Sequence, residues 1–328
     1  MATDRILDVV PADAVARFAR DWRQVAGDGA SEAVLVALSG GADSSALLLL
    51  FAALGDAAGP VRAATVDHGL REAAAEEARW AGRLALACGV PHAILAGPLP
   101  SRVGRTANVS ARARTLRYRL LEEHAAAIGA HWIVTAHHAD DQLETMAMRL
   151  ARGSGLRGLS GIRPRQGRVA RPLLGWRRAE LAALVAACGV GPIDDPSNID
   201  DRYDRARLRK ALAGAEWLDP VAAARSARAL AQADEAIGWA TDRVAAERCT
   251  FEAGSADLDV TGLPAEIARR LVERCLAHVD PVIAPRGDKV DRVLDRLEAG
   301  GTGTLGDTRY AAVGGRWTFR PAPPRRRH

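Results

Sequence analysis

The sequence predicts an α/β protein in which a mostly parallel β-sheet carries helices on both faces, followed by a smaller, mainly helical C-terminal domain. Short apolar runs of the kind that form buried strands alternate with longer helical stretches up to about residue 150, which is typical of such sheets. The length of 328 residues suits two domains. The hydrophobic content of 48 % and the charged content of 26 % are ordinary for a globular protein.

The elements of the first domain follow from the spacing of apolar residues. Residues 12–26 place apolar side chains at helical intervals, and residues 33–38 form the first β-type run. The other expected strands are 61–66, 92–95 and 132–135; the other expected helices are a stretch ending at residue 54, then 73–88, 107–128, 140–151, 176–188 and 203–213. Residues 152–175 are rich in Gly, Arg and Pro and are expected to form a loop.

The pattern changes around residues 214–220, and we place the domain boundary there, which divides the chain into residues 1–214 and 215–328. The second domain is expected to contain helices at 220–248, 264–279 and 286–299, a β-like hairpin through 302–319 and a basic tail.

Cysteine usage and apolar run length argue against several protein classes. The four cysteines are scattered, without a CxxC pair or a histidine at zinc spacing, so a disulfide framework, a structural zinc site and an iron–sulfur cluster are poorly supported. The N-terminus lacks the pattern of a signal peptide, and the longest apolar run is about half of what a membrane span needs. We therefore expect a cytoplasmic protein.

The charge balance is compatible with a phosphate-rich partner, since the net charge is +5 and the pI is about 9.4. Lys210 and Lys289 are the two lysines, and all other basic residues counted are arginines. Together with the abundance of alanine this resembles a GC-rich coding bias, so the number of arginines says little about function. The scarcity of lysine leaves almost no place for a catalytic lysine.

Residues 39–44 lie between an expected strand and the start of an expected helix, where unpaired N–H groups and the helix dipole favour a phosphate. Gly40 and Gly41 let the backbone approach an anion, and Ser39 and Ser44 add hydroxyl groups. The segment is neither a Walker A loop nor a GxGxxG loop. Asp43 stands where a kinase-type loop supplies lysine, and a carboxylate beside a polyphosphate indicates a divalent cation, Mg²⁺, between them.

The sequence Ser-Gly-Gly-x-Asp-Ser at residues 39–44 resembles the PP-loop of ATP pyrophosphatases, which cleave ATP between the α and β phosphates and transfer AMP to an acceptor. The resemblance implies a nucleotide-binding sheet of the PP-loop type and Mg²⁺ at Asp43. It also implies that ATP is bound by Ser39, Gly40, Gly41, Ala42, Asp43 and Ser44.

Further motifs resemble the tRNA(Ile)-lysidine synthetase family over about residues 30–210. The most specific is TAHHADDQLET at 135–145. The others, in chain order, are VDHGLR at 66–71, Asn108 with ARxxRY at 113–118, RGSG with Gly158-Leu159 at 152–159, RPLL at 171–174 and DPSN at 195–198. One departure is Ala206, where the family usually has asparagine, so any role of that side chain is absent or moved.

Asp141 and Glu144 share one face of the helix expected from residue 140, and His137 lies just before that helix. Two carboxylates beside a nucleotide need a cation, either Mg²⁺ or the ammonium group of a substrate. The resemblance implies that they hold free lysine and help to remove the proton of its ε-ammonium group. An amine attacks only when neutral, so a carboxylate or His137 is needed as the proton acceptor.

Basic and amide side chains complete the predicted site. Arg114 and Arg117 lie about one helical turn apart and are interpreted as a clamp on phosphate charge during adenylation. The resemblance places Asn198 and Arg209 near the lysine and the reacting cytidine. The loop at 152–155 is interpreted as a segment that closes over the site and meets RNA. Taken singly, these motifs have ordinary alternatives: a solvated acidic helix face, surface arginines, a proline turn and a connecting loop.

The resemblance implies an enzyme that joins free L-lysine to C2 of the wobble cytidine of tRNA(Ile) with a CAU anticodon. In the implied reaction the cytidine is first adenylated by Mg-bound ATP with release of pyrophosphate, and AMP leaves when lysine attacks. An unstacked base of a single-stranded loop can enter such a pocket at low cost. The oligomeric state stays open, with a homodimer as one option.

Two alternatives use the same sequence features. Another PP-loop enzyme, such as a tRNA thiolase or an amide-forming synthetase, would share the ATP loop, but the cysteine pair that favours a thiolase is absent from the sequence. A small-molecule synthetase would not need a separate basic domain. The second alternative is an inactive nucleotide-dependent RNA-binding module. Asp43, Asp141 and Glu144 argue against it, since binding an anion does not require carboxylates.

The C-terminal part contains arginines at helical spacings but no catalytic constellation, which suits an electrostatic grip on tRNA outside the anticodon. They are Arg225, Arg228, Arg269, Arg270 and Arg274. The alternative is a helical packing domain with solvated arginines.

Overall fold

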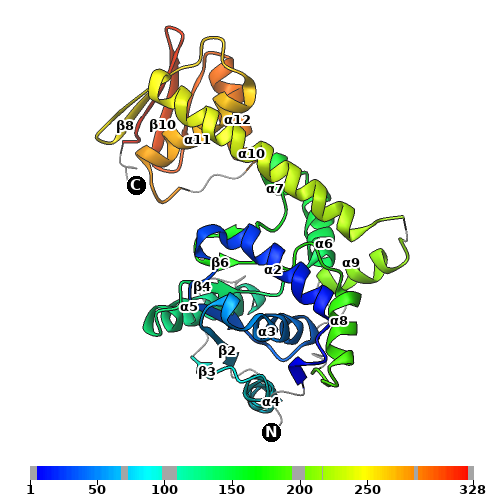
Figure 1. The fold of residues 1–328 in the computed structure, drawn as a ribbon. Helices are drawn as coiled ribbons and strands as arrows, with labels where there is room; N and C mark the ends of the chain where they lie inside the picture. The colour runs from blue at the N-terminus through cyan, green and yellow to red at the C-terminus, as the bar shows by residue number, and fades with distance from the viewer. Residues whose placement is uncertain are drawn as a thin grey trace. The chain divides into compact units, whose positions relative to one another are not determined.

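The computed structural model describes residues 6–67, 73–97, 109–193, 204–215, 217–283 and 287–323. The chain forms two compact units, Met1–Ala229 and Leu230–His328, which are coloured along the chain in Figure 1. The division falls inside the long helix α10 (Pro220–Arg248), whereas the change of sequence pattern at residues 214–220 ends where that helix begins. In the described residues no helix is both long enough and apolar enough to cross a membrane.

The first unit contains a six-stranded sheet with the order β3-β2-β1-β4-β6-β5. Its strands are β1 (Val34–Ala37), β2 (Val61–Asp67), β3 (His92–Ala96), β4 (Trp132–Val134), β5 (Arg165–Gln166) and β6 (Val169–Ala170). All neighbouring pairs are parallel except β5–β6. From β1 the chain continues to β2 on one side, whereas β4 pairs with β1 on the other side. The strand order therefore reverses between β1 and β4, and the carboxyl ends of these two strands border a topological switch point. Ligands bind at such points in open α/β sheets.

Helices cover both faces of this sheet, and strand alternation shows why. Val34, Val36 and Trp132 face the core that contains Phe18, Leu47 and Leu181, whereas Leu35 and Ile133 face the core that contains Leu121. The first core is covered by α2 (Ala12–Ala26), α3 (Ala42–Leu54), α4 (Ala73–Ala87) and α8 (Arg178–Ala187), and the second by α5 (Val109–Ala127). The predicted α/β class with helices on both faces is confirmed (Figure 1).

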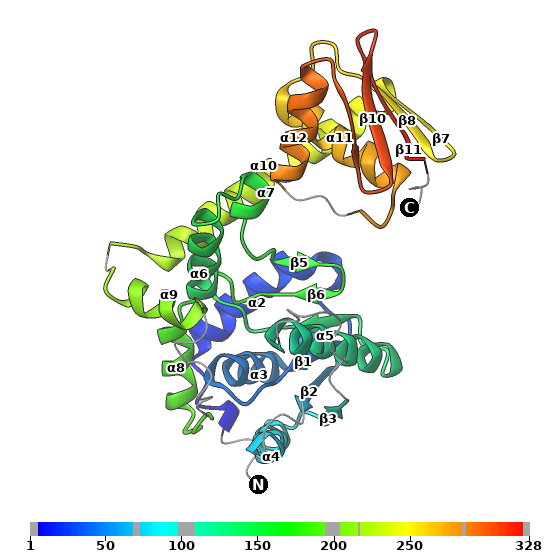
Figure 2. The ribbon, with the colours of Figure 1, turned by 180° about the vertical axis from the view of Figure 1, so that it is seen from behind.

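The expected loop at residues 152–175 is only partly a loop. It contains the short helix α7 (Leu156–Leu159) and the hairpin β5–β6, visible in Figure 2, whose second strand extends the parallel sheet beside β4. Val169 and Ala170 are buried, but a strand of two residues is too short to show a period in the sequence. The expectation of a continuous loop was therefore wrong.

The second unit combines helices with a five-stranded antiparallel sheet of order β7-β8-β11-β10-β9. Its strands are β7 (Cys249–Glu252), β8 (Ser255–Asp259), β9 (Thr302–Leu305), β10 (Thr308–Val313) and β11 (Arg316–Pro321), and its helices after α10 are α11 (Ala265–Val279) and α12 (Asp288–Glu298). Leu258, Leu271, Val293 and Phe319 form its core. The expected helices and terminal hairpin are present, while β7 and β8 are an addition that the sequence analysis did not anticipate.

Candidate active site

The loop after β1 is folded by its own serines. Gly40 has a φ of +88°, and a Cβ atom there would lie 3.1 Å from the Ile193 side chain, so this position requires glycine. The Ser44 hydroxyl accepts a hydrogen bond from the N–H of Ser39 at 3.1 Å and donates one to the Gly41 carbonyl at 3.0 Å. These bonds hold the loop against the first turn of α3.

The N-terminus of α3 is shaped to receive an anion. Gly41 precedes the helix in an extended conformation, and no side chain caps the helix. The N–H groups of the first turn, which include those of Ala42 and Asp43, have no partners within the helix. Backbone N–H groups and the positive end of the helix dipole together favour a phosphate at this place.

Asp43 points from this first turn toward a buried histidine. Its Oδ2 lies 3.4 Å from Nε2 of His138, whose side chain is 1 % exposed. The other carboxylate oxygen, Oδ1, is buried and has no hydrogen-bond partner among the residues that the structure describes. A buried carboxylate oxygen without a partner is costly, so this atom is available to a cation.

Mg²⁺ fits this arrangement when phosphates are present. Mg²⁺ in phosphate-transfer sites is held by one or two carboxylates together with substrate oxygens and water. Over the described ranges no group of three or more His, Cys, Asp or Glu residues could hold a metal ion by protein ligands alone. The buried Oδ1 of Asp43 is the protein atom that could hold Mg²⁺ jointly with a nucleotide at the adjacent loop.

His138 connects the phosphate loop to the next carboxylates. It caps α6 (Ala139–Leu150): its backbone N–H donates to Asp141 Oδ2 at 3.2 Å, and its Nδ1 accepts from the Asp141 N–H at 3.4 Å. Burial lowers the pKa of His138, but the close contact with Asp43 and the charges of Asp141 and Asp43 outweigh burial and the opposing charge of Arg178, so the pKa is raised. The nearby carboxylates therefore favour the charged ring, although in that form Nδ1 could no longer accept from the Asp141 N–H.

Glu144 is bound from two other helices. Its carboxylate, in a side chain that is 4 % exposed, accepts two hydrogen bonds from Arg209 of α9 (Asp204–Ala213), at 2.7 and 3.2 Å. Arg178 of α8 lies 3.6 Å away. Partial burial lowers the pKa of Arg209, but the hydrogen bond and charge of Glu144 and the charges of Asp141 and Asp43 outweigh it and raise the pKa. The negative charges of Glu144, Asp141 and Asp43 therefore all act on the Arg209 guanidinium.

The structure brings together Asp43, Asp141, Glu144 and Arg209 of the predicted site and adds His138 and Arg178. The motif contained both histidines, but the sequence analysis chose His137, whose Nδ1 lies 2.8 Å from the Thr135 hydroxyl. His138 occupies the N-cap, a position usually recognised by Ser, Thr, Asp or Asn, so the ordinary capping signal is missing. Arg178 and Glu144 lie on different helices, and no local sequence pattern indicates that they would meet.

The remaining predicted residues lie elsewhere or outside the described residues. Arg114 is exposed on α5 with its guanidinium 5.0 Å from the centre of the Tyr118 ring. In the described part of the chain it makes no hydrogen bond or ion pair with the carboxylates of the site. Asn198, and with it the DPSN motif, lies outside the described residues.

The segment that follows α6 is tied back to that helix. Gln142 bonds the backbone of Ile162 twice, through Nε2 at 2.8 Å and Oε1 at 2.6 Å. Arg149 donates to the carbonyls of Gly158 and Gly161 at 2.6 and 3.0 Å. These bonds fix the path of the segment close to the helix that carries Asp141 and Glu144.

Gly161→Ala is expected to destabilise the protein by about 1–3 kcal/mol, because φ at this position is +66° and a Cβ would lie 2.3 Å from Gln142 Oε1. Gly167→Ala is the matched control, since its φ is +57° and nothing lies within 4 Å of its Cβ. Urea unfolding of both variants measures the difference. Equal losses of stability in the two variants would show that the close approach of Gln142 to residue 161 does not affect the free energy of unfolding.

The arginines of α11 that are predicted to bind tRNA have carboxylate partners in the structure. Arg269 bonds Glu273 at 3.0 Å, Arg270 bonds Asp234 at 2.6 Å, and Arg274 bonds Asp242. Each guanidinium already has a carboxylate partner within the second unit, which weakens its attraction for phosphate. Arg225 and Arg228 are exposed on α10.

Comparisons with known proteins show the family of this chain. A family model described as a PP-loop domain matches residues 15–216. The tRNA(Ile)-lysidine synthase of Novosphingobium aromaticivorans is 43 % identical over 95 % of each chain, and that of Zymomonas mobilis is 42 % identical over 89 % of each. A U34-tRNA thiolase of Methanococcus maripaludis shares the fold, with a TM-score of 0.54, 17 % identity, and coverage of 66 % of this chain and 80 % of that chain. The chain therefore belongs to the tRNA(Ile)-lysidine synthase family of PP-loop proteins.

Proposed function

We propose that this protein ligates free L-lysine to C2 of the wobble cytidine of CAU-anticodon tRNA(Ile), with conversion of ATP to AMP and pyrophosphate. The observation that carries the proposal is the junction of Asp43, His138 and Asp141. It joins an anion-binding helix terminus to a carboxylate cluster through contacts of 3.4 and 3.2 Å. A site of this kind can serve a nucleotide and a cationic amine side by side.

In the first step the C2 carbonyl oxygen of cytosine attacks the α-phosphate of ATP, the bond to the β-phosphate oxygen breaks, and pyrophosphate leaves. Residues 39–44 bind the phosphates through the N–H groups at the start of α3. Asp43 would hold Mg²⁺, which would supply charge neutralisation of the phosphates. His138 keeps Asp43 in place and aligns α6 with the loop. Arg114 is retained as a candidate phosphate clamp on the strength of its motif.

In the second step the neutral ε-amine of lysine attacks C2, the bond from C2 to the adenylate oxygen breaks, and AMP leaves. Asp141 and Glu144 bind the ammonium form, and a carboxylate or His137 takes the proton that the amine must lose. Arg209 and Arg178 lie beside the Glu144 carboxylate, so an ammonium group would share this carboxylate with them. Arg209 and Asn198 are proposed to lie near the lysine and the cytidine.

The domain roles are part of the proposal. Residues 1–214 are proposed to carry ATP binding and catalysis, and residues 215–328 to bind tRNA outside the anticodon. A contribution of the second part is needed because isoleucine and methionine tRNAs can share the CAU anticodon. We also propose that the protein is located in the cytoplasm.

The test is to incubate the full chain with ATP, labelled lysine and a panel of tRNA transcripts. We expect label only in tRNA(Ile) with a CAU anticodon, together with equimolar AMP and pyrophosphate. Omission of lysine should leave pyrophosphate release tied to tRNA(Ile) and stop at the adenylated base. Failure to label any transcript under conditions in which the protein binds ATP would contradict the proposal.

A further inference from the structure

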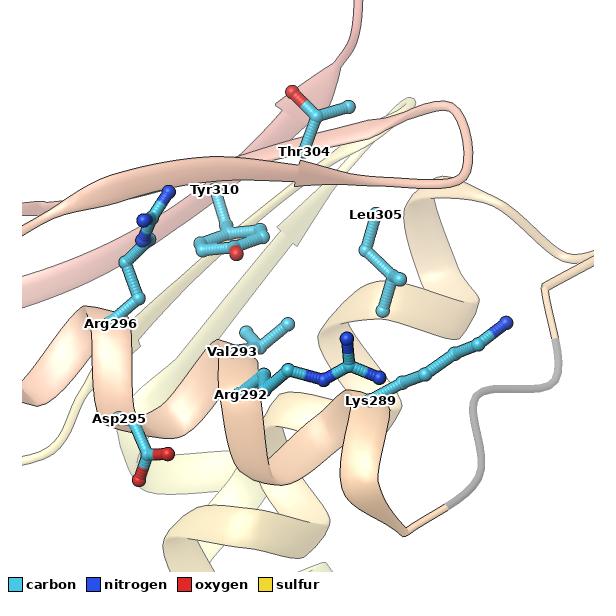
Figure 3. Close-up of a pocket in the computed structure, with 8 residues that line it drawn as sticks. All are labelled: Lys289, Arg292, Val293, Asp295, Arg296, Thr304, Leu305 and Tyr310. Atoms are coloured by element: carbon cyan, nitrogen blue, oxygen red, sulfur yellow. The ribbon is translucent and has the colours of Figure 1, made fainter.

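A cleft in the second unit lies between α12 and the β9–β10 hairpin and has a volume of about 500 Å³ (Figure 3). Its floor is apolar and includes Val293, Leu305 and the ring of Tyr310. Its rim is basic, because Lys289, Arg292 and Arg296 border it. Asp295 also borders the cleft, but Figure 3 shows its side chain directed away from the three cations.

The three cations form a row on one face of α12. Spacings of three and four residues place them on successive turns, and the row is about 10 Å long at 1.5 Å per residue. The buried residues Val290, Val293 and Leu297 hold the adjoining face of the helix against the core. The position of the row is therefore set by the packing of the helix.

The cations of the row lack the carboxylate partners that the arginines of α11 have. Within the described residues none of the three makes an ion pair. Arg292 Nε donates to the Asp288 carbonyl at 2.9 Å, and Arg296 Nη1 donates to the Thr302 carbonyl at 3.5 Å. Each guanidinium has five N–H donors, so most remain available to an anion.

Size and chemistry select the ligand. A cleft of about 500 Å³ lies within the range of small-molecule sites and cannot take up a duplex, but it can take up one nucleotide. The apolar floor suits a base and its sugar, and a row of about 10 Å spans the rise of about three nucleotides in one strand. Sequence-tolerant single-strand sites combine the same two features, a basic track and an apolar contact for bases.

We propose that this cleft binds an unpaired nucleotide of the tRNA substrate, with the flanking phosphodiesters along Lys289, Arg292 and Arg296 and the base against Leu305 and Tyr310. The proposal rests on the proposed function for the identity of the RNA. It assigns the attraction for phosphate in the second unit to α12 rather than to the arginines of α11.

The test compares two double variants of the full chain. Arg292→Gln/Arg296→Gln removes two charges from the cleft, and Arg309→Gln/Arg316→Gln removes two charges from exposed strand positions outside it. Fluorescence anisotropy at several salt concentrations measures binding of tRNA(Ile), a short oligouridylate, an RNA duplex of equal length, and AMP. Lys289→Gln provides a single-charge variant, and thermal melts check that all variants are folded.

We expect the cleft pair to weaken oligouridylate and tRNA binding at least about tenfold and to lower the salt slope by about 1.4, since each lost contact with a single strand removes about 0.7. The control pair should change binding much less, and duplex binding should respond less than oligouridylate binding. Equal effects of the two pairs, or no effect of the cleft pair, would overturn the proposal. Cleft-dependent binding of AMP without any effect on RNA would also overturn it and assign the cleft to a free nucleotide.

Lysine incorporation by the unaltered protein separates this proposal from the proposed function. If the protein labels tRNA(Ile) while the cleft pair binds RNA normally, only the cleft assignment fails. If the protein labels no tRNA but oligouridylate binding depends on the cleft, the cleft assignment stands and the lysine-ligase function fails.

Discussion

Asp43→Asn is expected to lower both pyrophosphate release and lysidine formation by about a thousandfold or more. The buried Oδ1 of Asp43 has no hydrogen-bond partner among the described residues, and its Oδ2 faces His138 at 3.4 Å. The amide of asparagine is neutral, so it would neither hold Mg²⁺ nor balance a protonated His138. Both losses fall on the first chemical step, and lysine attack cannot proceed without it.

The measurement is a pair of assays on one preparation: pyrophosphate release and incorporation of labelled lysine, each over a series of Mg²⁺ concentrations. Asp56→Asn is the matched control, because Asp56 is an exposed carboxylate just beyond the other end of α3. The control should retain normal turnover. Near-normal turnover of Asp43→Asn at saturating Mg²⁺ would remove Asp43 from the metal site.

Asp141→Asn and Glu144→Gln are expected to raise KM for lysine far more than KM for ATP. The loss of a charge partner for a desolvated ammonium group is worth roughly 2–4 kcal/mol. Asp141 also accepts the backbone N–H of His138, which asparagine can still do through its carbonyl oxygen. The comparison of aspartate with asparagine therefore changes the charge while keeping the helix cap.

Glu144→Gln needs a companion variant, because it also breaks the pair with Arg209. Arg209→Gln breaks the same pair but keeps the carboxylate, so KM for lysine should stay near or fall below its normal value even if a step that involves cytidine slows. Equal increases of KM for lysine in Glu144→Gln and Arg209→Gln would mean that Glu144 acts by positioning Arg209. Equal increases of KM for lysine and ATP in Asp141→Asn would place Asp141 around the nucleotide.

The sequence by itself determined the fold class, most element bounds and the place of the phosphate loop. Residues 12–26 and 220–248 form helices with the predicted limits, and the loop at 39–44 connects β1 with α3 as expected. These features are encoded locally: apolar residues recur at the period of the element, and glycines stand where the backbone needs them. The shared helix face of Asp141 and Glu144 follows from the same local rule.

Only the tertiary structure decided which side chains meet. Thr135 and His138 are buried, whereas His137 between them is half-buried, and no period describes this order. Packing put His138 rather than His137 beside Asp43. The bond between Glu144 and Arg209 joins residues 65 positions apart. Likewise the pair of Arg270 with Asp234 joins residues 36 positions apart. Such pairs depend on how helices and strands pack, and charged residues carry no periodic signal that specifies a distant partner, so a single sequence predicts the elements of this site better than its contacts.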